Sequence, residues 1–299
     1  MISVVVSTLN RAALLGQALR SLMSQKGLSI PAEVVVVDNG STDDTAALVA
    51  REGRTAPVPV RYLYEPRPGL SYARNAGSAA ARGEVVAFLD DDAWAEPEWL
   101  AELWDVYATD PAVACVGGRI VLDWPDRPRP AWLRPSFWGL LGAYDLGPRR
   151  RDLGAGDLLP FGGNISFRRS VFEARGGFRT ELGRRGARLG AGEEVELCVR
   201  VLRAGHRVVY APDAVVHHLV LPHRLERGFF RRLARDSGMA DTWVALARGE
   251  SRVRLAARYG GLMARALAVW CLYGPLPARR FAARLTFERV LGKLHGLWL

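Results

Sequence analysis

The segment Glu84–Asp92 reads EVVAFLDDD, an apolar run that ends in three consecutive carboxylates. The uninterrupted apolar stretch Val85–Leu89 is typical of a strand that is buried on both faces. Strands of a parallel sheet present ligands at their carboxyl ends, so the acidic cluster is expected at that edge. Three adjacent carboxylates repel one another, and a divalent cation with oxygen ligands relieves the repulsion. The segment therefore predicts a strand that carries a metal or phosphate site.

The chain around this segment alternates between strand and helix patterns. Ile2–Leu9, Glu33–Val37 and Val58–Tyr64 are further apolar runs rich in β-branched residues. Helical spacing predicts a helix at 14–23, and the capping residues 41–44 predict that a second helix begins after them. Further helices are predicted at 69–81 and at 97–107. Such alternation predicts an α/β fold with a mostly parallel sheet flanked by helices.

The pattern loosens beyond Val121. Residues 123–160 are rich in Pro, Trp and Arg without a clear period, which indicates a functional or mobile loop. A strand at 161–167, a helix at 193–204 and short strands at 208–210 and 214–217 follow, and beyond Arg224 only helices are expected, broken near 274–277. We divide the chain into a domain at 1–222, with halves at 1–120 and 121–222, and a helical extension at 223–299.

The positive charge is concentrated in that extension. The chain has 41 basic and 31 acidic residues, and 15 of the basic but 5 of the acidic ones lie from His223 onward. Apolar residues interleave with the arginines, as in a helix that lies on an anionic membrane surface. A solvated helix face or pairing with a second subunit, such as a homodimer, are the alternatives. No nucleic-acid-binding motif accompanies the charge, which disfavours nucleic acid as a partner.

Compartment signals are few. Three widely spaced cysteines without a CxxC pair argue against a disulfide framework or a zinc site. The N-terminus lacks the pattern of a secretory signal, and the uncharged run between Arg265 and Arg279 is too short to span a bilayer. We expect a cytoplasmic protein, peripheral at the inner face of the membrane if the extension binds lipid. The dominance of Arg over Lys suggests a GC-rich bacterial genome.

Polar side chains follow each of the predicted strands. Ser7–Arg11 follows the first, Asp38–Ser41 the second and Asp90–Asp92 the fourth. Because the carboxyl ends of parallel strands meet at one edge, these groups are expected to lie together. Further motifs follow in this order along the chain: Gly69–Gly77 (GLSYARNAG), Gly162–Arg169 (GGNISFRR), Gly176–Phe178 (GGF), Gly192–Leu197 (GEEVEL) and Pro212–His218 (PDAVVHH).

This ordered set closely resembles glycosyltransferase family 2, whose members have the GT-A fold, over roughly residues 2–222. The resemblance implies a nucleotide-sugar donor, most often a UDP-sugar. It places Asp38 on the nucleotide base and Arg74 near the base or diphosphate. It also assigns further residues to the nucleotide-sugar site, namely Thr8, Asn10, Arg11, Asp90 and Asp91.

The resemblance further implies a metal and a catalytic base. Asp92 resembles the direct ligand of Mn²⁺ or Mg²⁺, which neutralises charge as the nucleoside diphosphate leaves. His218 aligns with a metal- or phosphate-contacting histidine better than His217 does, and successive strand residues point to opposite faces. Glu194 aligns with the base of an inverting transfer, where family members usually carry Asp. The ionised form of a carboxylate is favoured near a helix N-terminus.

The acceptor side is less defined. The resemblance places Gly163, Asn164 and Glu193 beside the acceptor, which can be a saccharide, a lipid-linked sugar or a small molecule. Trp132, Phe137 and Trp138 either stack on the acceptor or anchor the loop. The Gln-x-x-Arg-Trp motif of processive synthases is absent, which favours addition of a single sugar.

Two other functions stay open at this point. A nucleotidyltransferase would use a similar α/β fold with acidic residues and a metal, but it usually has a Gly-rich loop after the first strand. Thr8–Arg11 lacks those glycines. A non-catalytic nucleotide-sugar-binding or membrane-scaffold protein would have no need of both Asp92 and Glu194. No P-loop motif is present.

Overall fold

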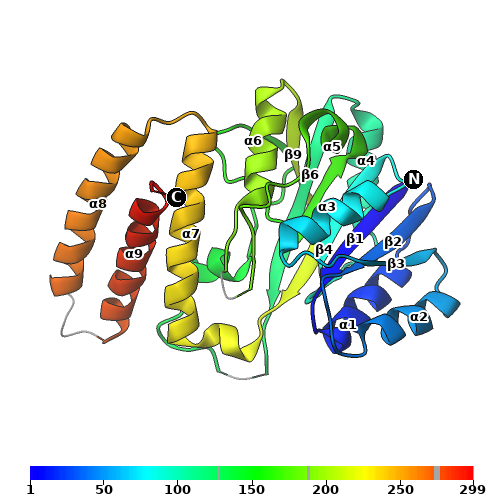
Figure 1. The fold of residues 1–299 in the computed structure, drawn as a ribbon, viewed down its shortest axis with the longest axis horizontal. Helices are drawn as coiled ribbons and strands as arrows, with labels where there is room; N and C mark the ends of the chain where they lie inside the picture. Colours follow the sequence, from blue (N-terminus) through cyan, green and yellow to red (C-terminus); the bar gives the residue numbers. More distant parts are fainter. Residues whose placement is uncertain (127, 187–188, 273–276, 299) are drawn as a thin grey trace.

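The computed structural model describes residues 1–126, 128–186, 189–272 and 277–298. Its N-terminal part is a parallel sheet in the order β3-β2-β1-β4 (Figure 1). The strands are β1 (Ile2–Thr8), β2 (Ala32–Asp38), β3 (Val60–Tyr64) and β4 (Val85–Asp90). The helices between and after them are α1 (Ala12–Met23), α2 (Thr45–Thr55), α3 (Leu70–Ala80) and α4 (Trp99–Thr109). The predicted α/β architecture is confirmed.

The sheet continues with strands that the sequence pattern predicts only in part. Beyond β4 come β8 (Asn164–Arg168), β6 (Val113–Asp123), β9 (Arg207–Leu219) and β5 (Ala93–Ala95), with β7 (Arg151–Leu153) also paired to β9. β8 runs antiparallel to both β4 and β6, whereas β6 and β9 are parallel. The sheet is therefore mixed in its second half.

The two short strands expected at 208–210 and 214–217 are one strand, β9. Its register against β6 shifts between Ala211 and Val215. Pro212 lies within that shift, and proline cannot donate to a strand ladder, so the chain bulges there and then resumes pairing. The bulge makes the sequence look like two strands.

Helices cover both faces of the sheet, which explains the apolar runs. Val4 and Val6 of β1 face a core shared with α1, α2 and α4. Val5 faces the opposite core, shared with α3, α5 (Arg169–Arg175) and α6 (Glu193–Arg203). Alternate residues of a strand point to opposite faces, so a strand buried on both sides reads as continuously apolar.

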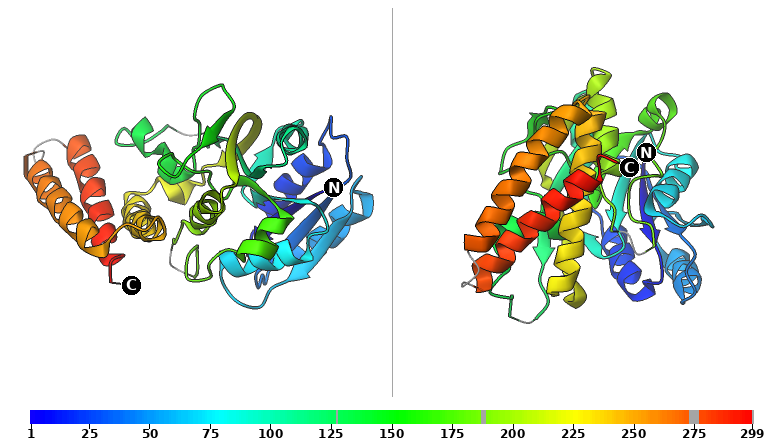
Figure 2. Two further views of the ribbon diagram at one scale, coloured as in Figure 1. Left: turned by 90° about the horizontal axis from the view of Figure 1, so that it is seen from above. Right: turned by 60° about the vertical axis from the view of Figure 1, so that its left-hand side comes forward.

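The C-terminal helices α7 (Arg227–Ala247), α8 (Arg252–Leu272) and α9 (Pro277–His295) lie at the end of the molecule far from the N-terminus (Figures 1 and 2). α7 packs against α9, and α9 against α8. No described helix is long and apolar enough to cross a membrane. The helix break expected at 274–277 falls largely outside the described residues.

A third apolar cluster joins this extension to the preceding part of the chain. Trp132 is buried there against Phe230 of α7 and Phe281 of α9. The cluster also includes Leu225, in the 3-10 helix η2 (Pro222–Leu225), and Leu141, in η1 (Pro135–Leu141). For Trp132 the geometry favours the anchoring alternative over stacking on an acceptor. The cluster crosses the expected domain boundary at 222, so α7 packs as part of the same body.

Candidate functional site

The loops after β1 and β2 are tied together by short hydrogen bonds. Asn10 has a φ of 53°, which asparagine tolerates better than most residues, and its Oδ1 accepts from the Thr42 N–H at 2.7 Å. Its own N–H donates to Ser41 Oγ at 2.9 Å. Asp43 accepts from the N–H groups of Ala12 and Thr45, so one carboxylate serves the first residues of both α1 and α2. These bonds fix the edge of the sheet where polar groups gather.

Asp38 lies at the carboxyl end of β2 with its side chain anchored on both oxygens. Oδ1 accepts from the Ser41 N–H and Oδ2 from the Tyr62 hydroxyl, each at 2.7 Å. Burial, followed by the hydrogen bond to Asp38, raises the pKa of Tyr62 to about 12. Each carboxylate oxygen has a second lone pair, so Asp38 can still accept from a ligand N–H.

Asp91 is held inside the protein. Its Oδ2 accepts from Thr8 Oγ1 at 2.8 Å and its Oδ1 from Arg11 at 2.9 Å. Burial and then the nearby charge of Asp92 raise the pKa of Asp91 to about 6, while Arg11 acts in the opposite direction. Asp91 therefore supports the loop and positions Thr8 and Arg11.

Asp92 sits among basic groups with its side chain 2% exposed. Its Oδ2 accepts from Arg224 at 2.6 Å and from Arg11 at 3.1 Å, and its Oδ1 lies 3.3 Å from His218 Nε2. Burial alone would raise the pKa of Asp92, but the positive charges around it, among them those of Arg224 and Arg11, hold it well below its ordinary value. The surroundings thus favour the ionised form of Asp92, which a metal ligand requires.

A candidate cation site forms where Asp92 meets Asp90 and His218. One ligand atom from each of the three residues lies within 4.8 Å of the others. The side chain of Asp90 is 33% exposed, so the group opens to solvent on that side. His218 Nδ1 is buried without a hydrogen-bond partner among the described residues. Two carboxylates and one imidazole form a donor set that can hold a divalent cation.

His217 faces away from this group. Its ring stacks on Trp94 with centroids 3.7 Å apart, and its Nε2 lies 2.6 Å from Glu96 Oε1. Both histidines belong to β9, where neighbouring side chains point to opposite faces. Of the two histidines, His218 is therefore the one that lies beside Asp90 and Asp92.

Arg74 connects the acidic group to the start of α6. Its guanidinium is buried and donates to Glu193 Oε1 at 2.7 Å and to Asp90 Oδ1 at 3.1 Å. A Cβ on Gly162 would lie 2.4 Å from Arg74 Nη1, and one on Gly163 would lie 2.9 Å from Asp90 Oδ2. Because Gly162 and Gly163 have no side chains, they leave space for the contact between Arg74 and Asp90.

The adjacent carboxylates Glu193 and Glu194 differ in their surroundings. Burial and the neighbouring Glu194 raise the pKa of Glu193 to about 8, whereas Arg74 acts against the shift. Glu194 Oε1 accepts from the Gly162 N–H at 3.3 Å, and its buried Oε2 has no partner among the described residues. Oε2 of Glu193 is likewise buried without a partner among the described residues. The start of α6 therefore carries two buried carboxyl groups, and Arg74 donates to one of them.

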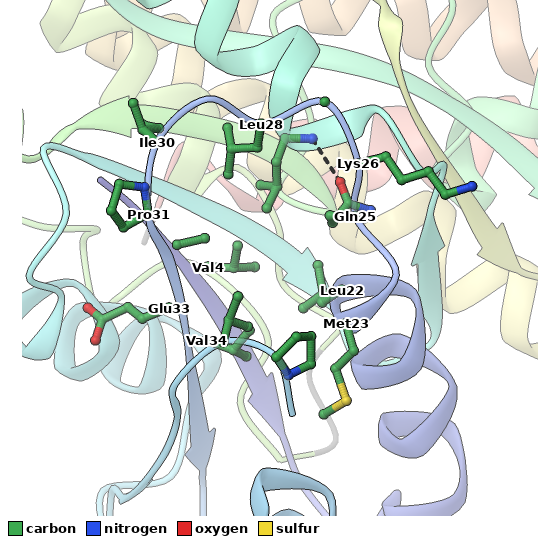
Figure 3. A pocket seen from close by; sticks show the side chains of 15 residues that line it. Val4, Leu22, Met23, Gln25, Lys26, Leu28, Ile30, Pro31, Glu33 and Val34 are labelled. Carbon is green, nitrogen blue, oxygen red and sulfur yellow. Dashed lines mark hydrogen bonds between the residues drawn. The ribbon is translucent and has the colours of Figure 1, made fainter. Parts of the chain in front are cut away.

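A separate pocket of about 310 Å³ lies at the opposite edge of the sheet (Figure 3). It lies at the amino end of β2, next to the end of α1. Its lining is mostly aliphatic, with Leu22, Leu28 and Val34 beside Gln25 and Lys26. None of the site residues that the sequence predicts belongs to it.

Comparison with known proteins identifies the family. A model of glycosyl transferase family 2 matches residues 3–176. The glucosyl-dolichyl phosphate glucuronosyltransferase of Haloferax volcanii is 33% identical over 233 residues, which cover 75% of this chain and 71% of that protein. This chain belongs to glycosyl transferase family 2. It is a glycosyltransferase, as the motif order predicts.

Solved structures show the GT-A fold of this family 2 member. A mannosyltransferase from Pyrobaculum calidifontis in complex with GDP-Man and Mn²⁺ matches with a TM-score of 0.65 at 23% identity, over 99% of this chain and 87% of that one. S. aureus TarS residues 1–349 in complex with UDP match with a TM-score of 0.57 at 17% identity, over 97% of this chain and 90% of that one.

Asn164, which the sequence predicts beside the acceptor, lies in the interior of this glycosyltransferase. Its side chain is fully buried. Its Oδ1 accepts from Trp99 Nε1, and its Nδ2 donates to the carbonyls of Arg119 and Ala214, all at 2.8 Å. The amide therefore holds β8 to its neighbours and has no free donor for an acceptor sugar. Glu193, also predicted beside the acceptor, is likewise buried against Arg74.

Replacing Asn164 by alanine is expected to lower the free energy of unfolding by about 1–3 kcal/mol or more. The reason is that the buried Trp99 N–H and the carbonyls of Arg119 and Ala214 lose their hydrogen-bond partner. Chemical denaturation measures the change. Gln17→Ala, on the exposed face of α1, is the control and should change stability by less than about 0.5 kcal/mol. Normal stability combined with a raised KM for the acceptor would instead support acceptor binding by Asn164.

Arg224 contacts the candidate site but is not among the residues that the sequence predicts there. It lies just after the expected domain boundary and is one of 15 basic residues in the extension. Nothing in its local sequence distinguishes it from the solvated arginines around it. Only the return of the chain from β9 to the acidic group brings it to Asp92.

Proposed function

We propose that this glycosyltransferase is an inverting, metal-dependent enzyme that moves a single sugar from a nucleoside diphosphate donor, UDP-linked first, to a hydroxyl acceptor. One observation carries the proposal. Arg74 joins the candidate cation site of Asp90, Asp92 and His218 to the start of α6, where Glu194 Oε2 is buried without a hydrogen-bond partner among the described residues. A leaving-group site and a base thus share one edge of the sheet.

Each side of the site has its own task. Asp38 accepts from the nucleotide base, and Thr8, Asn10 and Arg11 shape the loop beside it. Asp90, Asp92 and His218 would hold Mn²⁺ or Mg²⁺, and the ion would supply positive charge that neutralises the diphosphate. Glu194 takes the proton of the acceptor hydroxyl as that oxygen attacks the anomeric carbon from the side opposite the diphosphate. Arg74 orients Asp90 and keeps Glu193 apart from the reacting groups.

Turnover with purified enzyme tests the reaction. UDP-sugars are offered with simple saccharide and lipid-linked acceptors, with Mn²⁺ or with a chelator, and GDP-sugars are offered next. We expect release of nucleoside diphosphate that stops with the chelator, and an NMR spectrum of the product with inverted anomeric configuration. Release of pyrophosphate would indicate a nucleotidyltransferase. Donor binding without turnover on any acceptor would indicate a non-catalytic binding protein, and retained configuration would exclude the inverting mechanism.

We further propose that the extension docks on an anionic membrane through α8. The outer face of this helix carries exposed apolar residues, among them Val253 and Leu272 at 78% and 76% exposure. Exposed arginines lie along the same helix, namely Arg254, Arg258 and Arg265. No acidic residue occurs between Glu250 and Glu288. Exposed apolar residues beside basic side chains are suited to the interface of an anionic bilayer.

Co-sedimentation with vesicles tests this surface. Binding is expected to rise with the fraction of anionic lipid, to weaken with added salt, and to fall when Arg254, Arg258 and Arg265 are all replaced by glutamine. The matched control replaces Arg51, Arg169 and Arg175, which lie on other helices. Equal binding to neutral vesicles would remove the membrane proposal. A dimer that dissociates in the α8 variant would show instead that α8 pairs with a second copy.

A further inference from the structure

Arg224 contacts two of the three residues of the candidate cation site, Asp92 and His218. Its Nη2 donates to Asp92 Oδ2 at 2.6 Å and its Nη1 donates to His218 Nε2 at 3.1 Å. Its side chain is only 4% exposed. Because a guanidinium stays protonated, His218 must be the acceptor in this contact. Arg224 therefore uses electron pairs on two of the three residues that form the candidate cation site.

A divalent ion and Arg224 cannot both contact Asp92 and His218 without a cost in electrostatic free energy. A divalent ion on Asp92 would lie a few ångströms from a buried guanidinium, and like charges repel strongly where water is excluded. Arg11 already adds a second positive charge at Asp92. The group can accept an ion together with both arginines only when further negative charge arrives. A nucleoside diphosphate carries that charge.

We propose that Arg224 neutralises Asp92 and turns to the diphosphate when donor and ion bind together. The inference rests on the proposed metal-dependent use of a nucleotide donor. Arg224 lies in η2, directly after β9, and the Leu219 N–H donates to the Asp92 carbonyl at 2.9 Å. This backbone contact keeps the segment in place, so a change of side-chain rotamer is sufficient. The ion alone then binds weakly, and the donor and ion bind cooperatively.

The variant Arg224→Gln should change two affinities in opposite directions. Calorimetric titration of Mn²⁺ alone should show tighter binding than in wild type, since the competing cation is gone. Titration of UDP at saturating Mn²⁺ should show binding weaker by about tenfold or more, since a charged hydrogen bond to the diphosphate is lost. A purely structural role would weaken both affinities together.

Arg235→Gln is the matched control, because Arg235 pairs with Glu288 in the same extension away from the site. It should leave both affinities unchanged. If Arg224→Gln does not fold, Arg224→Lys provides the test, with smaller changes of the same two signs, because an ammonium cannot form the bidentate contact. Weaker or unchanged Mn²⁺ binding, or unchanged UDP binding, in the variant would overturn the role of Arg224. Wild-type enzyme that binds neither UDP nor GDP with Mn²⁺ would overturn the proposed function itself.

Discussion

Replacing Glu194 by glutamine is expected to lower kcat by about 10²–10⁴-fold, the usual contribution of a general base. Glutamine keeps the size of the side chain and can preserve the contact with the Gly162 N–H. It cannot accept a proton at the position of Glu194 Oε2, which has no hydrogen-bond partner in the described part of the chain. Donor binding should be little changed, because the nucleotide and ion are assigned to other residues. Steady-state kinetics and a UDP titration measure the two effects separately.

The companion variant Glu194→Asp distinguishes loss of the carboxylate base from a change in side-chain packing. It keeps a carboxylate at the residue type that family members usually carry there, and it should retain far more activity than Glu194→Gln. A Glu194→Gln enzyme with near-normal kcat would mean that another group takes the proton. Equal loss of kcat in both variants would point to packing at the start of α6 as the cause.

Replacing Asp92 by asparagine is expected to abolish the thermal stabilisation that UDP and Mn²⁺ give together. A ligand that binds only the folded state stabilises it by about 2.7 kcal/mol at a hundred times its dissociation constant. Asp92 contributes to the candidate cation site and is the group that draws His218, Arg224 and Arg11 together. Differential scanning fluorimetry with UDP, with Mn²⁺ and with both measures the loss.

Asp91→Asn is the matched control for that experiment. Asp91 is the adjacent carboxylate, but its oxygens bond Thr8 and Arg11 and it is not part of the cation group. Its variant should melt at a lower temperature and still respond to UDP with Mn²⁺. A full response in Asp92→Asn, or loss of the response in Asp91→Asn alone, would assign the ion to a different carboxylate.

The first half of the sheet could be predicted because its strands are buried on both faces. β1, β2 and β4 lie under helices on each side and therefore have nearly continuous apolar sequences. β6 and β7 were not among the predicted strands. β6 pairs mainly with β8 and β9, which are distant in sequence, and β7 has only three residues. Long-range pairing of this kind has no local signature.

The contacts that bring the candidate site together are also long-range. Arg74 reaches Glu193, Asp92 reaches Arg224, and Thr8 reaches Asp91, over separations of 119, 132 and 83 residues. Each partner is an ordinary polar residue in its own segment. Distance along the chain hides their proximity, and only the closed sheet with α6 and η2 at its edge brings them within hydrogen-bonding distance.

The sequence by itself determined the α/β class, the family and the residues at the ends of β1, β2 and β4, because burial on both faces and short motifs are written in adjacent residues. Tertiary structure alone decided that His218 and not His217 joins the acidic group, that Asn164 is held by buried hydrogen bonds, and that Arg224 lies against Asp92. Those outcomes depend on which face of a strand is covered and on which distant segment covers it, and neither is encoded in a local pattern.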